Sequence, residues 1–295
     1  MKSSLHQALS YARQVVELPD AGELEQPDYV TVFKLIWQSI RSFFIERPGR
    51  IIGSAFVLLM LWGYHGQLEL LGLLWPAWRG PGIDIGRRPQ LIPGLPWDNE
   101  LISFMLGLFL VVLVPILIIR LVFKQPLSDY GLGLPPKDRR ALALATFLTF
   151  TLLCLPGFWV GAHDPSMRQV YPFFKSFSSP GEFLLYEISY LPFFIAIEFI
   201  FRGYLLFGLA DIRDEDVPSI RAGVSGPLFF GKYAILIQML SYTAWHLGKP
   251  LPELWGTLAW GLAAGATAYA TRSIWPIVLS HWLLNVFLDA VILFT

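Results

Sequence analysis

Charged residues and cysteine are both scarce in this chain of 295 residues. Asp, Glu, Lys and Arg make up 15% of it, whereas a soluble domain averages about 25%, so the composition argues against an ordinary soluble protein. The single cysteine, Cys154, excludes an intramolecular disulfide framework. The formal net charge is zero, which gives no support for nucleic-acid binding. No internal repeat or low-complexity tract is visible, so a repeat architecture is not indicated.

The content of apolar residues is correspondingly high. They form 55% of the chain, and the mean hydropathy is +0.54. Eleven Trp and eleven Tyr residues fit the aromatic belts found at bilayer interfaces. We therefore predict an all-α fold, a polytopic transmembrane helix bundle of about seven (six to eight) spans. The expected spans are residues 50–72, 100–122, 140–161, 183–209, 228–247, 255–271 and 274–294.

The chain divides into three regions by composition. Residues 1–48 form a polar segment, residues 49–165 contain the N-terminal transmembrane helices, and residues 180–295 contain the polar motifs described below. In the first region, apolar residues from Phe33 to Phe44 recur at helical spacing. This pattern predicts an amphipathic helix, which lies either at the membrane interface or against the protein's own loops.

The loops between the expected spans differ in their content of Lys and Arg. Loops on the side of the N-terminus, including residues 211–227, are richer in basic residues than those on the other side, including residues 76–98. By the positive-inside rule, this difference favours a multi-pass protein of the cell membrane with a cytoplasmic N-terminus.

Two short features concern the last three expected spans. Gly261 and Gly265 form a small-xxx-small pair, which predicts close helix contact within the bundle more than a dimer face. The segment HLGKPLPE, which includes Lys249 and Glu253, is interpreted as a tight turn. A gate over a site is the alternative interpretation of that segment.

Five polar side chains lie within otherwise apolar stretches of the C-terminal half. Glu198 and Arg202 are four residues apart and share a helix face, as do His281 and Asn285, while His246 ends its own apolar run. Such groups are costly in lipid unless they meet partners. We therefore predict that three helices bring them together in one site inside the membrane.

These residue types suit the hydrolysis of an amide bond. A carboxylate and a histidine can activate water, and a second histidine with an amide can hold the oxyanion. Glu187 lies on nearly the same helix face as Glu198, and Asp289 extends the face of His281 and Asn285, so both are candidate supporting residues. Taken singly, the three groups also fit a structural ion pair, an interfacial histidine and a polar clamp between helices.

The three motifs resemble those of the CPBP family of glutamic-type intramembrane proteases (CAAX proteases and bacteriocin-processing enzymes, also called the Abi family). Members carry EExxxR, FxxxH and HxxxN on successive membrane helices, and the matching segments here are IEFIFRG, YTAWH and HWLLN. The resemblance implies an intramembrane endopeptidase in which Glu198, steered by Arg202, and His246 activate water. It further implies an oxyanion hole formed by His281 and Asn285, and a membrane-associated polypeptide as substrate. No cofactor is implied, although a Glu/His/His/Asn set also admits a metal.

The first motif departs from the family pattern. Counting back from Arg202, Ile197 occupies the place of the first glutamate and Glu198 that of the second. Three outcomes stay open: the helix is turned so that Glu198 serves as base, Glu187 contributes from three turns earlier, or the chemistry is lost. A catalytically inactive scaffold or partner-binding protein of the same fold is therefore the main alternative, and a small transporter or channel is the third.

Overall fold

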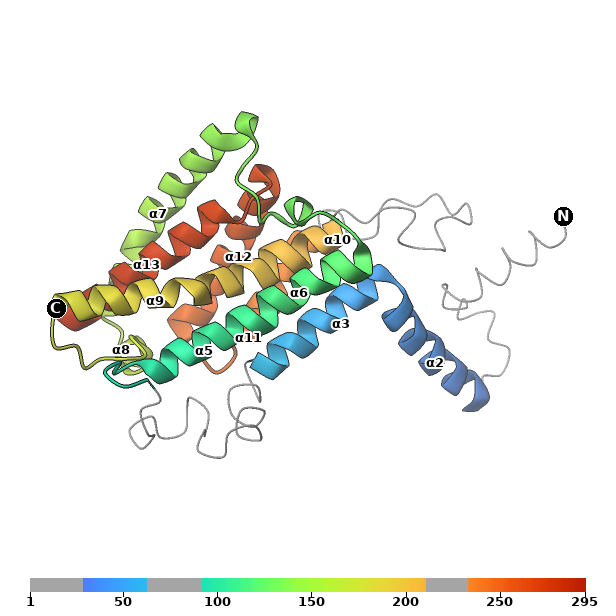
Figure 1. The fold of residues 1–295 in the computed structure, drawn as a ribbon, viewed down its shortest axis with the longest axis horizontal. Coiled ribbons are helices and arrows are strands. Elements are labelled where there is room, and N and C mark those ends of the chain that lie inside the picture. Colours follow the sequence, from blue (N-terminus) through green and yellow to red (C-terminus); the bar gives the residue numbers. More distant parts are fainter. Residues whose placement is uncertain (1–28, 63–91, 211–232) are drawn as a thin grey trace, which may run out of the picture.

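All regular structure in the described part of the chain is helical. The computed structural model describes residues 29–62, 92–210 and 233–295 (Figure 1). The main helical segments are α2 (Tyr29–Ile45), α3 (Arg47–Met60), α5 (Asp98–Leu108), η3 (Phe109–Leu113), α6 (Val114–Leu117), η4 (Ile118–Phe123), α7 (Arg140–Ala162), α8 (Pro165–Val170), α9 (Pro180–Glu198), η7 (Phe199–Phe207), α10 (Gly208–Ala210), α11 (Tyr233–Trp245), α12 (Leu251–Thr271) and α13 (Trp275–Phe294). Short 3₁₀ segments, η5 (Leu127–Tyr130) and η6 (Lys137–Arg139), precede α7. The predicted all-α fold is confirmed for these residues.

Four helical stretches are long and apolar enough to cross a membrane. They are Asp98–Phe123, Lys137–Ala162, Pro180–Ala210 and Trp275–Phe294. Helices α3, α11 and α12 also fall within predicted spans, but α3 and α11 adjoin residues that lie outside the described ranges. The count of seven spans therefore stays a prediction. The end of the first predicted span, most of the loop at 76–98 and the loop at 211–227 also lie outside the described residues.

The stretch from α9 to α10 is the central element of the bundle. Two hydrogen bonds cap its start: the Ser179 hydroxyl accepts one from the backbone N–H of Glu182 (3.2 Å), and the Glu182 carboxylate accepts one from the N–H of Ser178 (2.7 Å). Pro180 stands in the first turn, where proline costs no hydrogen bond. After Glu198 the helix widens into the π-helical segment η7, in which all nine residues are buried. Irregular turns of this kind are frequent at functional sites.

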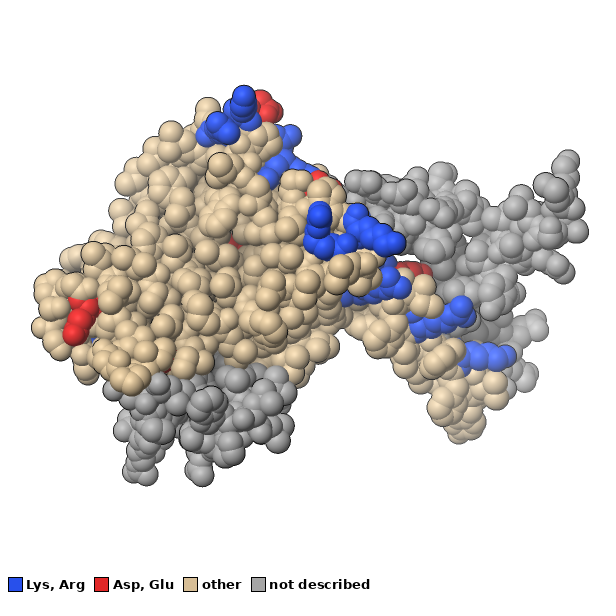
Figure 2. All heavy atoms as spheres, in the orientation of Figure 1, with Lys and Arg blue, Asp and Glu red and all other residues tan. Residues whose placement is uncertain are grey.

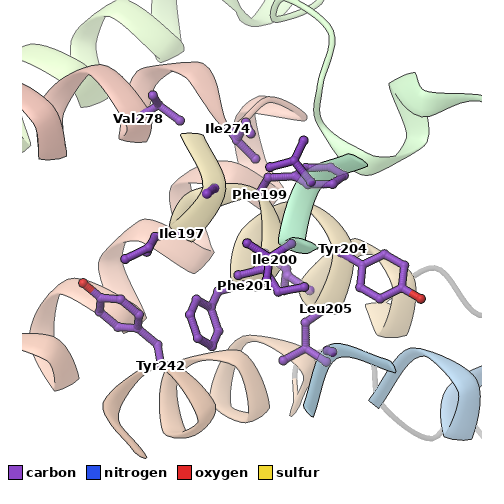
Figure 3. Packing of buried hydrophobic residues seen from close by; sticks show 14 of the residues in the cluster. Ile197, Phe199, Ile200, Phe201, Tyr204, Leu205, Tyr242, Ile274 and Val278 are labelled. Carbon is purple, nitrogen blue, oxygen red and sulfur yellow. The ribbon is translucent and has the colours of Figure 1, made fainter. Parts of the chain in front are cut away.

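An apolar core surrounds η7. Figure 3 shows η7 side chains packed with Ile274 and Val278 at the start of α13 and with Tyr242 of α11. By contrast, α7 lies at the outer edge of the bundle (Figure 1). Of the most apolar 18 residues in Lys137–Ala162, only 6% are buried, whereas 89% are buried in the corresponding part of Pro180–Ala210. Polar groups on α9 and η7 must therefore find their partners within the protein.

Helix α2 projects from the bundle and contacts α3 (Figure 1). It occupies the stretch where the amphipathic pattern predicts a helix. Its exposed apolar side chains include Phe33, Ile36, Trp37, Ile40 and Phe44. No described part of the chain covers this apolar face, and both interpretations of the amphipathic pattern stay predictions.

The glycine pair on α12 brings α11 and α12 into close contact. A Cβ atom on Gly261 would lie 3.0 Å from the Met239 Cγ atom, and one on Gly265 would overlap the Gln238 side-chain amide. That amide donates a hydrogen bond of 2.6 Å to the Gly261 carbonyl. The predicted helix contact within the bundle is confirmed.

Replacing Gly265 by alanine is expected to lower the free energy of unfolding by about 1–3 kcal/mol, because the added methyl group overpacks this contact. Gly256→Ala on the same helix is the matched control, since a Cβ atom there meets nothing within 4 Å. Alanine also improves helix propensity at that position. Unfolding in detergent, followed by circular dichroism, measures both variants, and equal stabilities would contradict the packing argument.

Candidate active site

Glu198 and Arg202 form a fully buried ion pair at the junction of α9 and η7. Neither side chain is exposed, and Arg202 Nη1 lies 3.3 Å from Glu198 Oε2. The Arg202 guanidinium also stacks on the ring of Tyr242 from α11, with Cζ 4.1 Å from the ring centroid. A buried guanidinium needs such partners because an uncompensated charge in a medium of low dielectric constant is strongly unfavourable.

Glu198 also contacts the last helix. His281 Nδ1 lies 2.7 Å from Glu198 Oε1, and the indole N–H of Trp260 on α12 donates to the same oxygen at 3.3 Å. The imidazole of His281 lies between two aromatic rings, with centroid distances of 4.9 Å to Phe194 and 5.1 Å to Trp260. Because the carboxylate accepts a hydrogen bond from Nδ1, the other nitrogen, Nε2, is the one available to a substrate.

His246 lies directly after α11 and is 5% exposed. Its Nδ1 is 2.7 Å from the carbonyl oxygen of Tyr242, one turn earlier, and Nε2 is 3.6 Å from Oε1 of Glu253. The Tyr242 ring lies 4.4 Å from the His246 ring and also carries the Arg202 guanidinium. The Tyr242 ring therefore contacts both His246 and the guanidinium of the Glu198–Arg202 pair.

Glu253 is the site residue that sequence reasoning missed. The segment that contains it is a tight turn, as interpreted, with Gly248 at φ +90° and the N–H of Lys249 donating to the His246 carbonyl at 3.0 Å. Glu253 stands in the first turn of α12, where it accepts a hydrogen bond of 2.7 Å from the hydroxyl of Tyr171. The sequence feature that could have indicated Glu253 is a carboxylate seven residues after His246.

Asn285 lies one turn beyond His281 on α13, as the spacing predicts. Its amide Nδ2 donates to Asp289 Oδ2 at 3.0 Å. Glu187 of α9 lies beside both side chains, and its backbone carbonyl accepts from the Trp282 indole at 2.8 Å. Helices α9 and α13 therefore run antiparallel, with Glu198 beside His281 and Glu187 beside Asn285. Glu187 is thus placed at the amide end of the site, three turns from Glu198.

Ile197 lies in the apolar core and is 1% exposed. Figure 3 places it beside Tyr242, in the cluster around η7. The neighbouring residue Glu198 instead points to His281 and Arg202. The described carboxylate that contacts His246 therefore comes from α12 and not from α9.

The described residues contain no group of three or more His, Cys, Asp or Glu side chains arranged to hold a metal ion. The arrangement instead offers two carboxylate–histidine pairs, Glu198–His281 and Glu253–His246, with an amide one turn from the first pair. Such a set provides proton acceptors for water and donors for an oxyanion.

Comparison with protein families agrees with the three motifs. Residues 180–287 match the family model described as type II CAAX prenyl endopeptidase, Rce1-like. The match begins with α9 and includes Glu198, His246 and both His281 and Asn285. No curated protein and no solved structure matches the chain. The resemblance inferred from the motifs is confirmed: the region that carries the candidate site, residues 180–287, is similar to the Rce1-like type II CAAX prenyl endopeptidases.

Proposed function

We propose that this protein is an intramembrane endopeptidase that hydrolyses peptide bonds in membrane-associated or leader-bearing polypeptides, using protein side chains and water. The observation that carries the proposal is the 2.7 Å contact between Glu198 and His281, made in the interior of the bundle by residues of two separate motifs. A histidine oriented by a buried carboxylate is a recurrent catalytic arrangement. His246, from the second motif, lies within electrostatic range of His281.

In this proposal His281 and Asn285 stabilise the oxyanion. His281 Nε2, when it carries a proton, and an amide hydrogen of Asn285 are the donors, and they stand one helical turn apart on α13. Glu198 fixes the His281 ring through Nδ1, and Arg202 balances the charge of Glu198. The family resemblance also makes Glu198 the general base. Its contacts with His281, Trp260 and Arg202 favour the orienting role, because both carboxylate oxygens already have donors or a cation beside them.

The substrate class follows from where the site lies. His281 and His246 have side-chain exposures of 16% and 7% within a bundle of membrane-spanning helices. A polypeptide that already lies in or on the bilayer can reach such a site, whereas a folded soluble protein cannot. The family description adds prenylated C-terminal peptides to the candidate substrates.

We further propose that the N-terminus faces the cytoplasm of the cell. Basic side chains gather at the end of the bundle where α3 and α7 begin (Figure 2). They are Arg47, Arg50, Arg120, Lys124, Lys137, Arg139, Arg140 and Arg272. Among the described residues, fewer Lys and Arg side chains lie at the opposite end, where α8 and the start of α9 are found (Figure 1). This asymmetry supports the orientation expected from the positive-inside rule.

The direct test is cleavage by the purified protein in lipid vesicles. A library of membrane peptides, including prenylated C-terminal peptides and leader peptides, is incubated with wild type and His281→Ala, and products are identified by mass spectrometry. We expect wild type to cut a subset and His281→Ala to be slower by about 10²–10³-fold, the usual loss for one oxyanion donor. Equal cleavage by both would assign the activity to a contaminant.

The second candidate function is a catalytically inactive scaffold that binds a membrane polypeptide. Ile197 favours it, because an apolar residue is buried where the family pattern places its first glutamate. A scaffold predicts that well-folded wild type cuts no peptide in the library but retains bound peptides on purification. It also predicts that His281→Ala retains the same peptides as wild type.

A further inference from the structure

We propose that Glu253, in the first turn of α12, supplies the carboxylate that is missing at position 197 and acts with His246 as the general base. This inference rests on the proposed peptide hydrolysis and names a residue of its site outside the three motifs. Glu253 and Ile197 stand on different helices, so the acid reaches His246 from α12 instead of α9.

The first argument is the way the two side chains face each other. A carbonyl oxygen can only accept a hydrogen bond, so His246 Nδ1, 2.7 Å from the Tyr242 carbonyl, carries the proton. Nε2 of the neutral ring is then an acceptor, and it faces the acceptor Oε1 of Glu253 at 3.6 Å. Two acceptors at this distance, too far apart for a direct hydrogen bond, are suited to share the hydrogens of one water molecule.

The second argument is the state of the Glu253 carboxylate. Its Oε1 accepts from the Tyr171 hydroxyl at 2.7 Å, which fixes the orientation of the group. Its Oε2 is buried and has no hydrogen-bond partner among the described residues, so the carboxylate keeps an unused acceptor. The side chain is 15% exposed, which leaves it a path to water.

Lys249, four residues earlier in the sequence, places a positive charge near this carboxylate. Burial lowers the pKa of the Lys249 ammonium, and the nearby Glu253 carboxylate acts in the opposite direction. The ammonium also lies over the rings of Tyr171 and Phe173, at 5.5 and 5.0 Å from their centroids. Burial raises the pKa of the Glu253 carboxyl, and Lys249 acts in the opposite direction, favouring the ionised form that a general base requires.

The third argument is the position relative to the oxyanion donors. Trp260 lies seven residues after Glu253 on α12, on nearly the same face and about 10.5 Å along the axis. It contacts both Glu198 and His281. His281 also lies within electrostatic range of Glu253. One face of α12 therefore carries both the carboxylate beside His246 and the indole beside His281.

The hydrolytic step balances with these groups. As the oxygen of water bonds to the carbonyl carbon, one of its protons passes to the Glu253 carboxylate at Oε1, the oxygen that faces His246, and the π electron pair moves onto the carbonyl oxygen, held by His281 and Asn285. His246 Nε2 accepts the second hydrogen of the water and orients it. When the intermediate collapses, the C–N bond breaks and the carbonyl forms again. Glu253 returns its proton to the leaving amine.

The test compares wild type, Glu253→Gln and Glu182→Gln in single-turnover cleavage of the library peptide that wild type cuts fastest. Glu182 is the matched control, because it is also the third residue of a helix that starts with a proline in its first turn, and it has no histidine partner. We expect Glu253→Gln to bind the peptide as wild type does and to cut it about 100-fold more slowly or worse. Glu182→Gln should cut at the wild-type rate. A Glu253→Gln rate within threefold of wild type would overturn the assignment.

A second measurement does not depend on activity. The chain has five histidines, so ¹⁵N-labelled histidine gives few signals, and His246→Ala assigns the one that matters. We expect Glu253→Gln to shift the Nε2 resonance of His246 and to leave that of His281 in place. An unchanged His246 resonance would overturn the pairing. Failure of wild type to cut any peptide counts against the proposed function instead, so the two failures are distinguishable.

Discussion

Replacing Glu198 by glutamine is expected to lower the free energy of unfolding by about 3–5 kcal/mol and to abolish cleavage. The stability loss arises because the Arg202 guanidinium is left fully buried without a counter-ion, which is the costly way to break a buried ion pair. The loss of cleavage arises because His281 loses the carboxylate that orients its ring. Denaturant titration in mixed micelles, followed by tryptophan fluorescence, measures the stability change.

The double variant Glu198→Leu/Arg202→Met separates the two effects. Replacing both members of a buried pair by apolar residues of similar volume is often neutral or stabilising. We therefore expect this variant to unfold near the wild-type denaturant concentration while remaining inactive. Wild-type stability of Glu198→Gln would show that Arg202 does not depend on Glu198, and the proposed ion pair would be wrong.

Replacing His246 by alanine is expected to slow cleavage by about 10²–10⁴-fold, the range for removal of a group that handles the proton of the attacking water. The fold should persist, because His246 lies just beyond the end of α11 and its side chain donates one hydrogen bond there, to the Tyr242 carbonyl. Single-turnover kinetics on the library peptide measure the loss, and circular dichroism measures the fold.

His163→Ala is the matched control for that loss. His163 also lies directly after a helix and places Nδ1 2.8 Å from the carbonyl of the residue four positions earlier, Trp159, but it is exposed. It should cut at the wild-type rate. The double variant His246→Ala/Glu253→Gln should be scarcely slower than either single variant, since residues that act as a unit are non-additive. Fully additive losses would assign His246 and Glu253 to separate steps.

Much of this fold follows from residue patterns along single helices. Apolar runs predict where helices lie, and proline in the first turn of α9, α12 and α13 sets their observed starts within a few residues of the predicted ones. The i, i+4 spacing correctly places His281 and Asn285 on one face of α13, with Asp289 one turn further. These relations are local, so a sequence contains them directly.

The sequence does not show which side chains on different helices contact each other. Motif order suggests Glu198 with His246, whereas the contact formed is Glu198 with His281. The carboxylate beside His246 comes from the first turn of α12, in a segment interpreted only as a turn. Each helix can rotate about its axis without changing its own pattern, and packing against neighbours decides that rotation. A π-helical turn after Glu198 adds a further change that no spacing rule anticipates.

The π-helical segment η7 affects how the site would respond to the deletion of a residue. Its hydrogen-bonded rings contain one residue more than those of an α-helix. Removal of one residue from η7 can therefore restore α-helical winding while the helical segments before and after it keep their relative orientation. Removal of one residue from the α-helical part between Glu187 and Glu198 would instead rotate these two carboxylates by about 100° relative to each other. We therefore expect a single-residue deletion to disturb the site less in η7 than in α9.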